Sequence, residues 1–441
     1  RIFAIHPSEV EFCGCETYRN ISELPSLIDA AFVGVNRKAT VDIILQLSKV
    51  NCGGAVCFAS GYSEAVVELK DGYELQRALI DAAGRMPILG PNCYGIINYF
   101  DSFCLWPDQH GGQPVDSGVA IITQSSNIMI NLTMQKRGLP IGYAVTAGNQ
   151  AQLGLAELAT NIVKDTRVTA LGLYVEGLGS IRNFEKLVSL CDELGKAIVV
   201  IKIGKSEHAQ LSAVSHTASL AGNDKGASAL MKRLGVARVN SLSEFIETLK
   251  VFHCHGRLSG SSVASVSCSG GEASLIADIC NGSQLLFPKL TKEQTNGLNS
   301  ALGGKVALAN PLDYHTYIWG DASKMAQTFI SIMQDKNIDI GIIIVDFPRS
   351  DFCDPDAWSC VVEAAVITKK AIKKPIALMS TLAENIEESV AKDLMTKNLI
   401  PLCGMDEGLA AIIAASTQKT DLDPVNYPVI LPNNNKSACL L

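Results

Sequence analysis

The segment SAVSHTASLAGND, residues 212–224, carries one histidine, His216, among small and hydroxyl-bearing side chains. It follows AIVVIKIG, an apolar segment typical of a buried parallel strand. Open α/β sheets bind ligands at the carboxyl ends of such strands, and a neutral imidazole is a good nucleophile near pH 7. His216 is therefore a candidate phosphoryl carrier, with Glu176 in LYVEG placed to orient it. Composition alone favours the plainer interpretation, a turn-capping histidine and a solvated glutamate.

Two Ser/Gly turns that begin helices give a second chemical signal. They are TQSSN, residues 123–127, and SCSGGEAS, residues 267–274, and each follows an apolar strand. The free N–H groups and the positive dipole end of such a helix suit a phosphate or another anion. Serine and glycine also cap ordinary helices, so one turn alone is weak support. Two equivalent turns could hold one phosphoryl group from both sides.

Short apolar strands alternate with amphipathic helices, and this pattern predicts an α/β protein. Residues 1–112 form one βαβ unit. The pattern then occurs twice, since GVAIITQSSNIMINLTMQKRG is echoed by SVASVSCSGGEASLIADICNG. We therefore predict two doubly wound parallel-sheet domains, 113–258 and 259–420. The Pro/Asn-rich residues 421–441 are typical of a linker, and an opening without methionine suggests a piece of a longer polypeptide.

Composition excludes several classes of protein. The net charge of −7, without a basic stripe, argues against a nucleic-acid surface. No apolar run reaches about twenty residues, so we expect no membrane association. The 14 cysteines are scattered and form no CxxC pair, which favours a reducing compartment, the cytoplasm. GKS lacks the P-loop glycine at Val199, and HCHG at 253–256 is better explained as a helix end than as a metal site.

Five ordered motifs carry a resemblance to a known family. LGPNCYGIIN (89–98), LYVEG (173–177), VSHTASLAGND (214–224), GVARVNSLSEFIETLK (235–250) and ANPLDY (309–314) resemble the NDP-forming acyl-CoA synthetases, which include ADP-forming acetate–CoA ligase and succinyl-CoA synthetase. The resemblance spans nearly the whole chain. It implies a Rossmann-like CoA-binding domain followed by two flavodoxin-like ligase domains. It also implies an acid–thiol ligase that uses ATP and CoA, releases ADP and phosphate, and works through a phosphohistidine and an acyl phosphate.

The resemblance assigns roles to individual residues. His216 is the phosphorylated histidine, and Glu176 stabilises it. The residues that hold the phosphoryl group are Gln124, Ser125, Ser126, Ser269, Gly270 and Gly271. The CoA-binding residues are Pro7, Val35, Asn36, Ser60, Gly61, Asn92 and Cys93. The sequence departs from the family at HPS (6–8), where a basic residue is usual, and at Ser126 and Ala218, where glycine is usual.

The family's ATP-grasp domain is missing from these residues, so ATP and Mg²⁺ are expected to bind mainly to a module outside them. That module follows in the same polypeptide or is a separate subunit of a homo- or hetero-oligomer. Two alternatives stay open. One is a CoA-sensing regulatory part of a protein acetyltransferase, which typically lacks the phosphorylated histidine. The other is a non-catalytic CoA-binding protein, in which His216 and Glu176 would have no role.

Aromatic residues offer a first hypothesis about the small-molecule carboxylic acid. NPLDYHTYIWGD contains Tyr314, Tyr317 and Trp319, and FCLWPDQHGG contains Trp106. Such clusters belong to the core as often as to a pocket. If these four line the acyl pocket, they favour an aromatic, bulky or cationic acid over acetate, because rings contact planar groups and cations.

Overall fold

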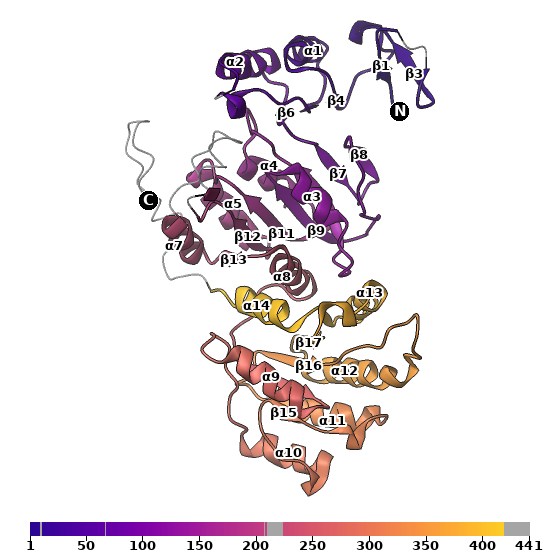
Figure 1. Ribbon diagram of the computed structural model, residues 1–441, viewed down its shortest axis with the longest axis vertical. Helices are drawn as coiled ribbons and strands as arrows, with labels where there is room; N and C mark the ends of the chain where they lie inside the picture. The colour runs from indigo at the N-terminus through magenta and orange to yellow at the C-terminus, as the bar shows by residue number, and fades with distance from the viewer. Residues whose placement is uncertain (9–10, 67, 207, 210–223, 419–441) are drawn as a thin grey trace.

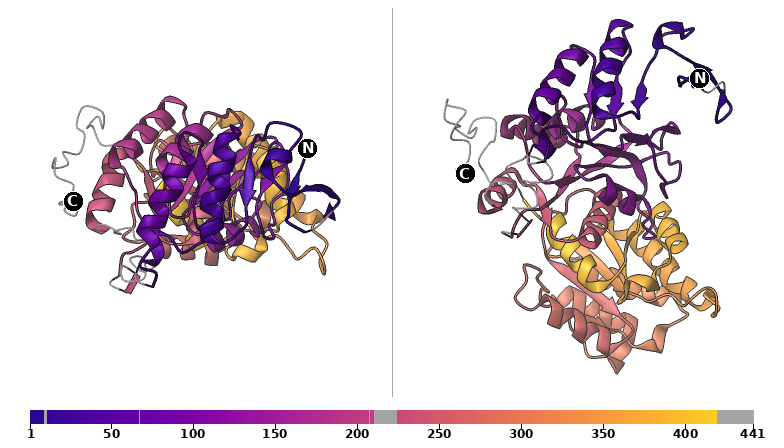
Figure 2. Two further views of the ribbon diagram at one scale, coloured as in Figure 1. Left: turned by 90° about the horizontal axis from the view of Figure 1, so that it is seen from above. Right: turned by 45° about the horizontal axis from the view of Figure 1, so that its top comes forward.

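The computed structural model describes residues 1–8, 11–66, 68–206, 208–209 and 224–418 (Figure 1). Three α/β units follow one another along the long axis, and Figure 2 shows the same order from a second direction. By their sheets they divide into an N-terminal unit (residues 1–95), a middle unit (96–258) and a C-terminal unit (259–418). No helix within the described ranges is both long and apolar enough to cross a bilayer.

The N-terminal unit contains two three-stranded sheets. The first has the order β1-β3-β2 and consists of β1 (Ala4–Ile5), β2 (Glu11–Phe12) and β3 (Cys15–Tyr18). The second is parallel with the order β4-β5-β6: β4 (Ala31–Val33), β5 (Ala55–Cys57) and β6 (Ile88–Leu89), connected through α1 (Arg37–Lys49) and α2 (Gly72–Ala83). The helices bury Ile44 and Leu79 in the core of this unit. This is the predicted Rossmann-like βαβ pattern.

The middle unit is built on a seven-stranded sheet of order β13-β12-β11-β9-β10-β7-β8. Its parallel strands are β9 (Gly118–Thr123), β10 (Ile141–Thr146), β11 (Val168–Val175), β12 (Ala197–Lys202) and β13 (Ala237–Val239). Every residue of β9 and β12 is buried, as expected for strands covered by helices on both faces. The helices are α3 (Ser126–Thr133), α4 (Leu155–Ile162), α5 (Ile181–Glu193), α7 (Asp224–Leu234) and α8 (Leu242–Cys254).

The last two strands of this sheet come from a part of the chain that the sequence assigned to the first domain. β7 (Ile96–Asn98) pairs antiparallel with β10, and β8 (Phe103–Leu105) pairs antiparallel with β7. The sheets therefore divide before Ile96, although the sequence placed the boundary at 112. The apolar pattern along a strand predicts that it pairs, but it does not reveal its partner.

The C-terminal unit has a five-stranded parallel sheet of order β15-β14-β16-β17-β18. Its strands are β14 (Val263–Ser267), β15 (Leu312–Asp313), β16 (Ile340–Ile344), β17 (Ile376–Met379) and β18 (Ile400–Leu402). Its helices are α9 (Gly270–Cys280), α10 (Lys292–Leu302), α11 (Ala322–Met333), α12 (Ser359–Ile372), α13 (Glu388–Thr396) and α14 (Met405–Ala415). The parallel strands of the middle unit follow the same order, so both sheets have the flavodoxin-like arrangement.

Helices α8 and α14 pack together between the middle and C-terminal units. One hydrophobic cluster runs through both units at this interface and includes Phe245 and Ile412. The fully buried Lys250 ammonium forms an ion pair with Glu247 at 2.7 Å and contacts Cys403 Sγ at 3.2 Å. The ion pair lies within α8, whereas the shared apolar cluster and the contact between Lys250 and Cys403 connect the middle and C-terminal units.

Candidate active site

A cavity of about 1080 Å³ lies between the N-terminal and middle units. The loops after β4 and β5 line one end, and the turn after β9 together with the end of β11 lines the other. The carboxyl ends of parallel strands from two sheets thus open into one space, the usual position of a ligand in open α/β sheets. The lining includes the predicted residues Val35, Asn36, Ser60, Asn92, Cys93, Gln124, Ser125, Ser126 and Glu176.

At the N-terminal end, the start of α1 and the loop after β5 are fixed against each other. Asn36 caps α1, because its side-chain oxygen accepts from the N–H groups of residues 38 and 39 at 3.1 and 3.0 Å. Arg37 donates to both oxygens of Asp71, at 2.8 and 2.9 Å, and to Gly61 O at 2.6 Å. Gly61 has φ +97°, and a Cβ there would lie 2.8 Å from the Arg37 side chain. A glycine is needed at this contact.

The GPNC loop, residues 90–93, connects the two ends of the cavity. The Asn92 N–H donates to Ala59 O at 3.0 Å, and the Asn149 N–H of the middle unit donates to Pro91 O at 2.9 Å. The Cys93 side chain is almost completely buried. Burial raises the pKa of this thiol far above its usual range, so it stays protonated and is a poor nucleophile.

At the other end, Gln124 connects the turn after β9 to the end of β11. Its Oε1 accepts from the backbone N–H groups of Glu176 and Gly177, the second at 3.0 Å, and its Nε2 donates to Gly177 O at 3.1 Å. The sequence assigned this side chain to the phosphoryl group. In the structure it is almost fully buried and holds the backbone that carries Glu176.

The two serines that follow begin helix α3. Ser125 is the N-cap, and its hydroxyl accepts from the Ile128 N–H at 3.5 Å. The Ser126 hydroxyl accepts from the Tyr94 N–H at 3.1 Å, so it connects the helix to the GPNC loop. With both hydroxyls in these contacts, the helix offers an anion its first backbone N–H groups and its dipole.

A buried lysine lies near Glu176 and was not singled out from the sequence. Lys202 ends β12, directly beside Val175 of β11, and is 3% exposed. Burial, assisted by the charge of Arg238, lowers the pKa of Lys202, while the charge of Glu176 acts in the opposite direction. Burial and the Glu176 carboxylate also raise the pKa of Tyr174. The sequence feature that could have indicated Lys202 is its position as a single cation at the end of the apolar strand AIVVIK.

His216 itself lies outside the described residues, so its position relative to Glu176 stays a prediction. The chain that leads to it leaves the sheet at Lys202, and Ala209 of this connection lines the cavity. Strand β11, which Glu176 directly follows, is the direct neighbour of β12 in the sheet.

Several other predicted residues lie away from the cavity. Pro7 is exposed and does not line it, and Gly61 reaches it only through Arg37. Residues 269–271 begin helix α9 on the C-terminal sheet, so of the two turns only the one after β9 lines this cavity. The structure does not bring the two turns together here.

Three of the four residues proposed for the acyl pocket lie in the C-terminal unit, away from this cavity. Tyr314 is buried edge-to-face against Phe329 in the core of the C-terminal unit. Trp319 packs against Trp358, and Tyr317 is 65% exposed. Trp106 contacts the ring of Tyr94, a cavity residue, but does not itself line the cavity.

The HCHG segment forms the end of helix α8: His253 packs against β11, and His255 is exposed at the C-cap. His253 Nδ1 lies 2.8 Å from the Thr169 hydroxyl, and burial lowers the pKa of this imidazole. Gly256, at φ +87°, follows the end of α8. Across the described part of the chain, no group of three or more His, Cys, Asp or Glu side chains is arranged to hold a metal ion.

Comparison with known families identifies the units. Residues 1–99 match the CoA binding domain family, and residues 116–252 match the family of succinyl-CoA ligase like flavodoxin domains. These two matches confirm the resemblance found in the motifs: the chain contains a CoA binding domain and a succinyl-CoA ligase like flavodoxin domain.

Individual relatives are moderately similar. The chain is 28% identical over 426 residues to subunit alpha of acetate–CoA ligase [ADP-forming] II from Pyrococcus furiosus, covering 95% of this chain and 90% of that subunit. It is 29% identical over 356 residues to trans-feruloyl-CoA synthase FCS1 from an unknown prokaryotic organism, covering 79% of this chain and 50% of that protein. The chain spans about half the length of several curated relatives that it matches.

Solved structures show the same fold. The apo form of dinucleotide forming acetyl-coenzyme A synthetase 1 from Candidatus Korarchaeum cryptofilum superposes with a TM-score of 0.76 at 20% identity, covering 94% of this chain and 88% of that one. A crystal structure of a Pyrococcus horikoshii OT3 protein gives a TM-score of 0.78 at 21% identity, covering 97% and 91%. At these identities the match concerns the fold alone.

Proposed function

We propose that this chain carries the CoA-binding and phosphohistidine sites of an ADP-forming acyl-CoA synthetase. One observation carries the proposal: a single cavity joins the loops after β4 and β5 to the start of α3 and to Glu176. A ligase of this type must bring a thiol, a carboxylate and a phosphoryl group together, and a cavity shared by two sheets meets that requirement. The relatives named for ADP-forming acid–CoA ligation support it.

The proposed reaction has three steps. The Nε2 or Nδ1 lone pair of His216 attacks the γ-phosphorus of ATP, and ADP leaves. A substrate carboxylate oxygen then takes the phosphoryl group from the histidine and becomes an acyl phosphate. Finally the CoA sulfur attacks the acyl carbon, the carbon–oxygen bond to phosphate breaks, and acyl-CoA and inorganic phosphate form. Dividing one difficult displacement in this way lowers each barrier.

The residues of the cavity support these steps. The first N–H groups of α3 present fixed dipoles to the phosphoryl oxygens, so little reorganisation is needed as charge develops. Glu176 accepts the imidazole N–H and balances the positive charge of the ring, and Gln124 fixes the backbone that carries it. The protonated Cys93 takes no covalent part, and we assign it to packing.

We further propose that ATP and Mg²⁺ bind mainly to an ATP-grasp module, in the same polypeptide or as a separate subunit of an oligomer. One relative is named as a subunit alpha, which supports the second arrangement. The cytoplasm, which supplies ATP and CoA and keeps the 14 cysteines reduced, is the proposed location.

The direct test is a phosphorylation assay on the full-length protein together with its ATP-grasp module. With γ-labelled ATP, the wild type should acquire acid-labile label, and His216→Asn should acquire none. His208→Asn is the matched control, because His208 is exposed and belongs to the same connection. Label retained in His216→Asn would overturn the assignment. Acetylation of a protein substrate, without phosphate release from ATP, acid and CoA, would favour the regulatory acetyltransferase alternative.

A further inference from the structure

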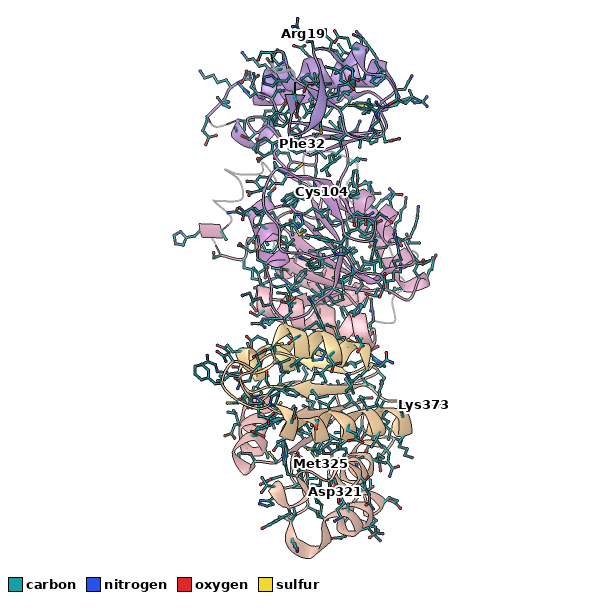
Figure 3. All side chains as sticks on the ribbon, turned by 90° about the vertical axis from the view of Figure 1, so that its right-hand side faces the viewer. Arg19, Phe32, Cys104, Asp321, Met325 and Lys373 are labelled. Atoms are coloured by element: carbon teal, nitrogen blue, oxygen red, sulfur yellow. The ribbon has the colours of Figure 1, made fainter. Side chains whose placement is uncertain are left out.

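Four aromatic rings form a row that crosses from the N-terminal unit into the middle unit. Ring centroids are 5.9 Å apart for Phe32 and Phe58, 5.6 Å for Phe58 and Tyr94, and 5.4 Å for Tyr94 and Trp106. Phe32 lies on the side of the N-terminal unit that faces the middle unit (Figure 3) and packs against the core of the latter. Only the two central rings, Phe58 and Tyr94, line the cavity.

Tyr94 lies beside the proposed phosphoryl site. Its backbone N–H donates to the hydroxyls of Ser126, at 3.1 Å, and Thr146, at 3.0 Å. Ser126 is the first residue of α3, whose N-terminus is the proposed phosphoryl position. In an acyl phosphate, a single oxygen separates the acyl carbon from phosphorus. The acyl chain must therefore begin within a few ångströms of this helix end, which the Tyr94 backbone contacts and beside which Tyr94 lines the cavity.

Phe58 lies next to Tyr94 in the lining of the cavity. It follows β5 directly, and its N–H donates to Val33 O at 3.2 Å, so its backbone is fixed by the sheet. Its side chain is 38% exposed, a large apolar surface that faces the cavity. The outer rings, Phe32 and Trp106, support the two central rings from both sides and restrict their rotation.

The two rings that face the cavity, Phe58 and Tyr94, favour an aromatic acid over a small aliphatic one. Aromatic rings interact well at centroid distances of about 4.5–7 Å in tilted or edge-to-face arrangements. A flat aromatic acid can cover both rings, whereas acetate would leave Phe58 in contact with water. Arg37, the cation in the described lining of the cavity, is already paired with Asp71, so the rings rather than this charge provide the contact surface for the acyl group.

We propose that Phe58 and Tyr94 form the acyl subsite and that the preferred substrate is an aromatic carboxylic acid. The inference rests on the proposed ligase function. It replaces the acyl pocket expected from Tyr314, Tyr317 and Trp319, which lie in the C-terminal unit.

Steady-state turnover of the complete enzyme tests the proposal. We expect a higher kcat/KM with benzoate or cinnamate than with acetate or hexanoate. Phe58→Leu and Tyr94→Leu should lower kcat/KM for the aromatic acids by about tenfold or more, and change that for acetate less than about twofold. Phe103→Leu is the matched control: Phe103 is 41% exposed, lies on β8 and does not line the cavity. It should leave the preference unchanged.

Binding measurements separate this proposal from the proposed function. Cinnamate bound beside Tyr94 should quench the fluorescence of Trp106, and Trp106→Phe should remove that change. Quenching without acyl-CoA formation would support the subsite and overturn the ligase assignment. Two outcomes would overturn the subsite and retain the ligase. One is acyl-CoA formation with a preference for acetate. The other is that Phe58→Leu and Tyr94→Leu weaken CoA binding, measured by calorimetry, and leave the acid preference unchanged.

Discussion

Replacing Gln124 with methionine should disturb the site without touching its proposed catalytic groups. Methionine fills a similar volume but makes none of the three hydrogen bonds that Gln124 forms with the backbone of Glu176 and Gly177. At a net value of about 0.5–1.5 kcal/mol for each bond, the folded state should lose roughly 2–4 kcal/mol. Most of this loss should appear at the end of β11.

Hydrogen exchange gives the local readout. The amide protons of Glu176 and Gly177 point at Gln124 Oε1, so in Gln124→Met they should exchange up to about tenfold faster. Phosphohistidine yield in the complete enzyme should fall by about tenfold to a hundredfold, because a displaced Glu176 no longer orients the imidazole.

Gln294→Met is the matched control. Gln294 is equally buried, and its amide accepts from the Thr291 N–H at 2.8 Å and donates to Ile332 O at 2.6 Å, but it belongs to the C-terminal unit. Its replacement should lower stability by a similar amount and leave phosphorylation unchanged. The positioning role of Gln124 would be refuted if Gln124→Met and Gln294→Met reduced the phosphohistidine yield equally, or if Gln124→Met left exchange at Glu176 unchanged.

Four further predictions concern single groups. Glu176→Gln should keep CoA binding, measured by calorimetry, and should lower turnover by about 10²-fold. Normal turnover would show that Glu176 has only a surface role. Gly148→Ala places a Cβ 2.3 Å from Pro91 O at φ +54° and should cost about 1–3 kcal/mol in chemical denaturation. Burial raises the pKa of Glu272 to about 7 from 4.5, so the folded state loses stability as the pH rises through this interval. Glu272→Gln should raise Tm at pH 8 and not at pH 4. Equal shifts of Tm at both pH values would count against a raised pKa of Glu272. Cys93→Ala should retain turnover within a few-fold, whereas complete loss would restore a chemical role.

The sequence was sufficient for the features that depend on local pattern. The apolar runs of β9 and β12 are buried throughout, as their composition predicts. The capping pattern at Ser125 predicts where α3 begins. The motifs predicted the two domain families that match, because their order along the chain is specific.

The features that the sequence could not supply depend on contacts between distant segments. Phe58 and Tyr94 stand 36 positions apart, in the connections that follow β5 and β6, and the pairing of these two strands brings their ring centroids to 5.6 Å. The partner of the Gln124 amide is likewise a backbone segment more than fifty residues away. The aromatic residues of NPLDYHTYIWG are close in sequence, and this clustering suggested a pocket, yet two of them pack into the C-terminal core.

The pairing of β7 and β8 with β10 has a practical consequence for dissecting this protein. A fragment that began at residue 113 would lack both strands and would expose the N–H and C=O groups along one side of β10. Open, apolar strand edges recruit other chains and promote aggregation. Ile141, Ala144 and Val145 of that strand are buried in the intact chain. A fragment that began a few residues before Ile96 would keep the hairpin over this edge, so it should remain monodisperse in size-exclusion chromatography, whereas the shorter fragment should associate.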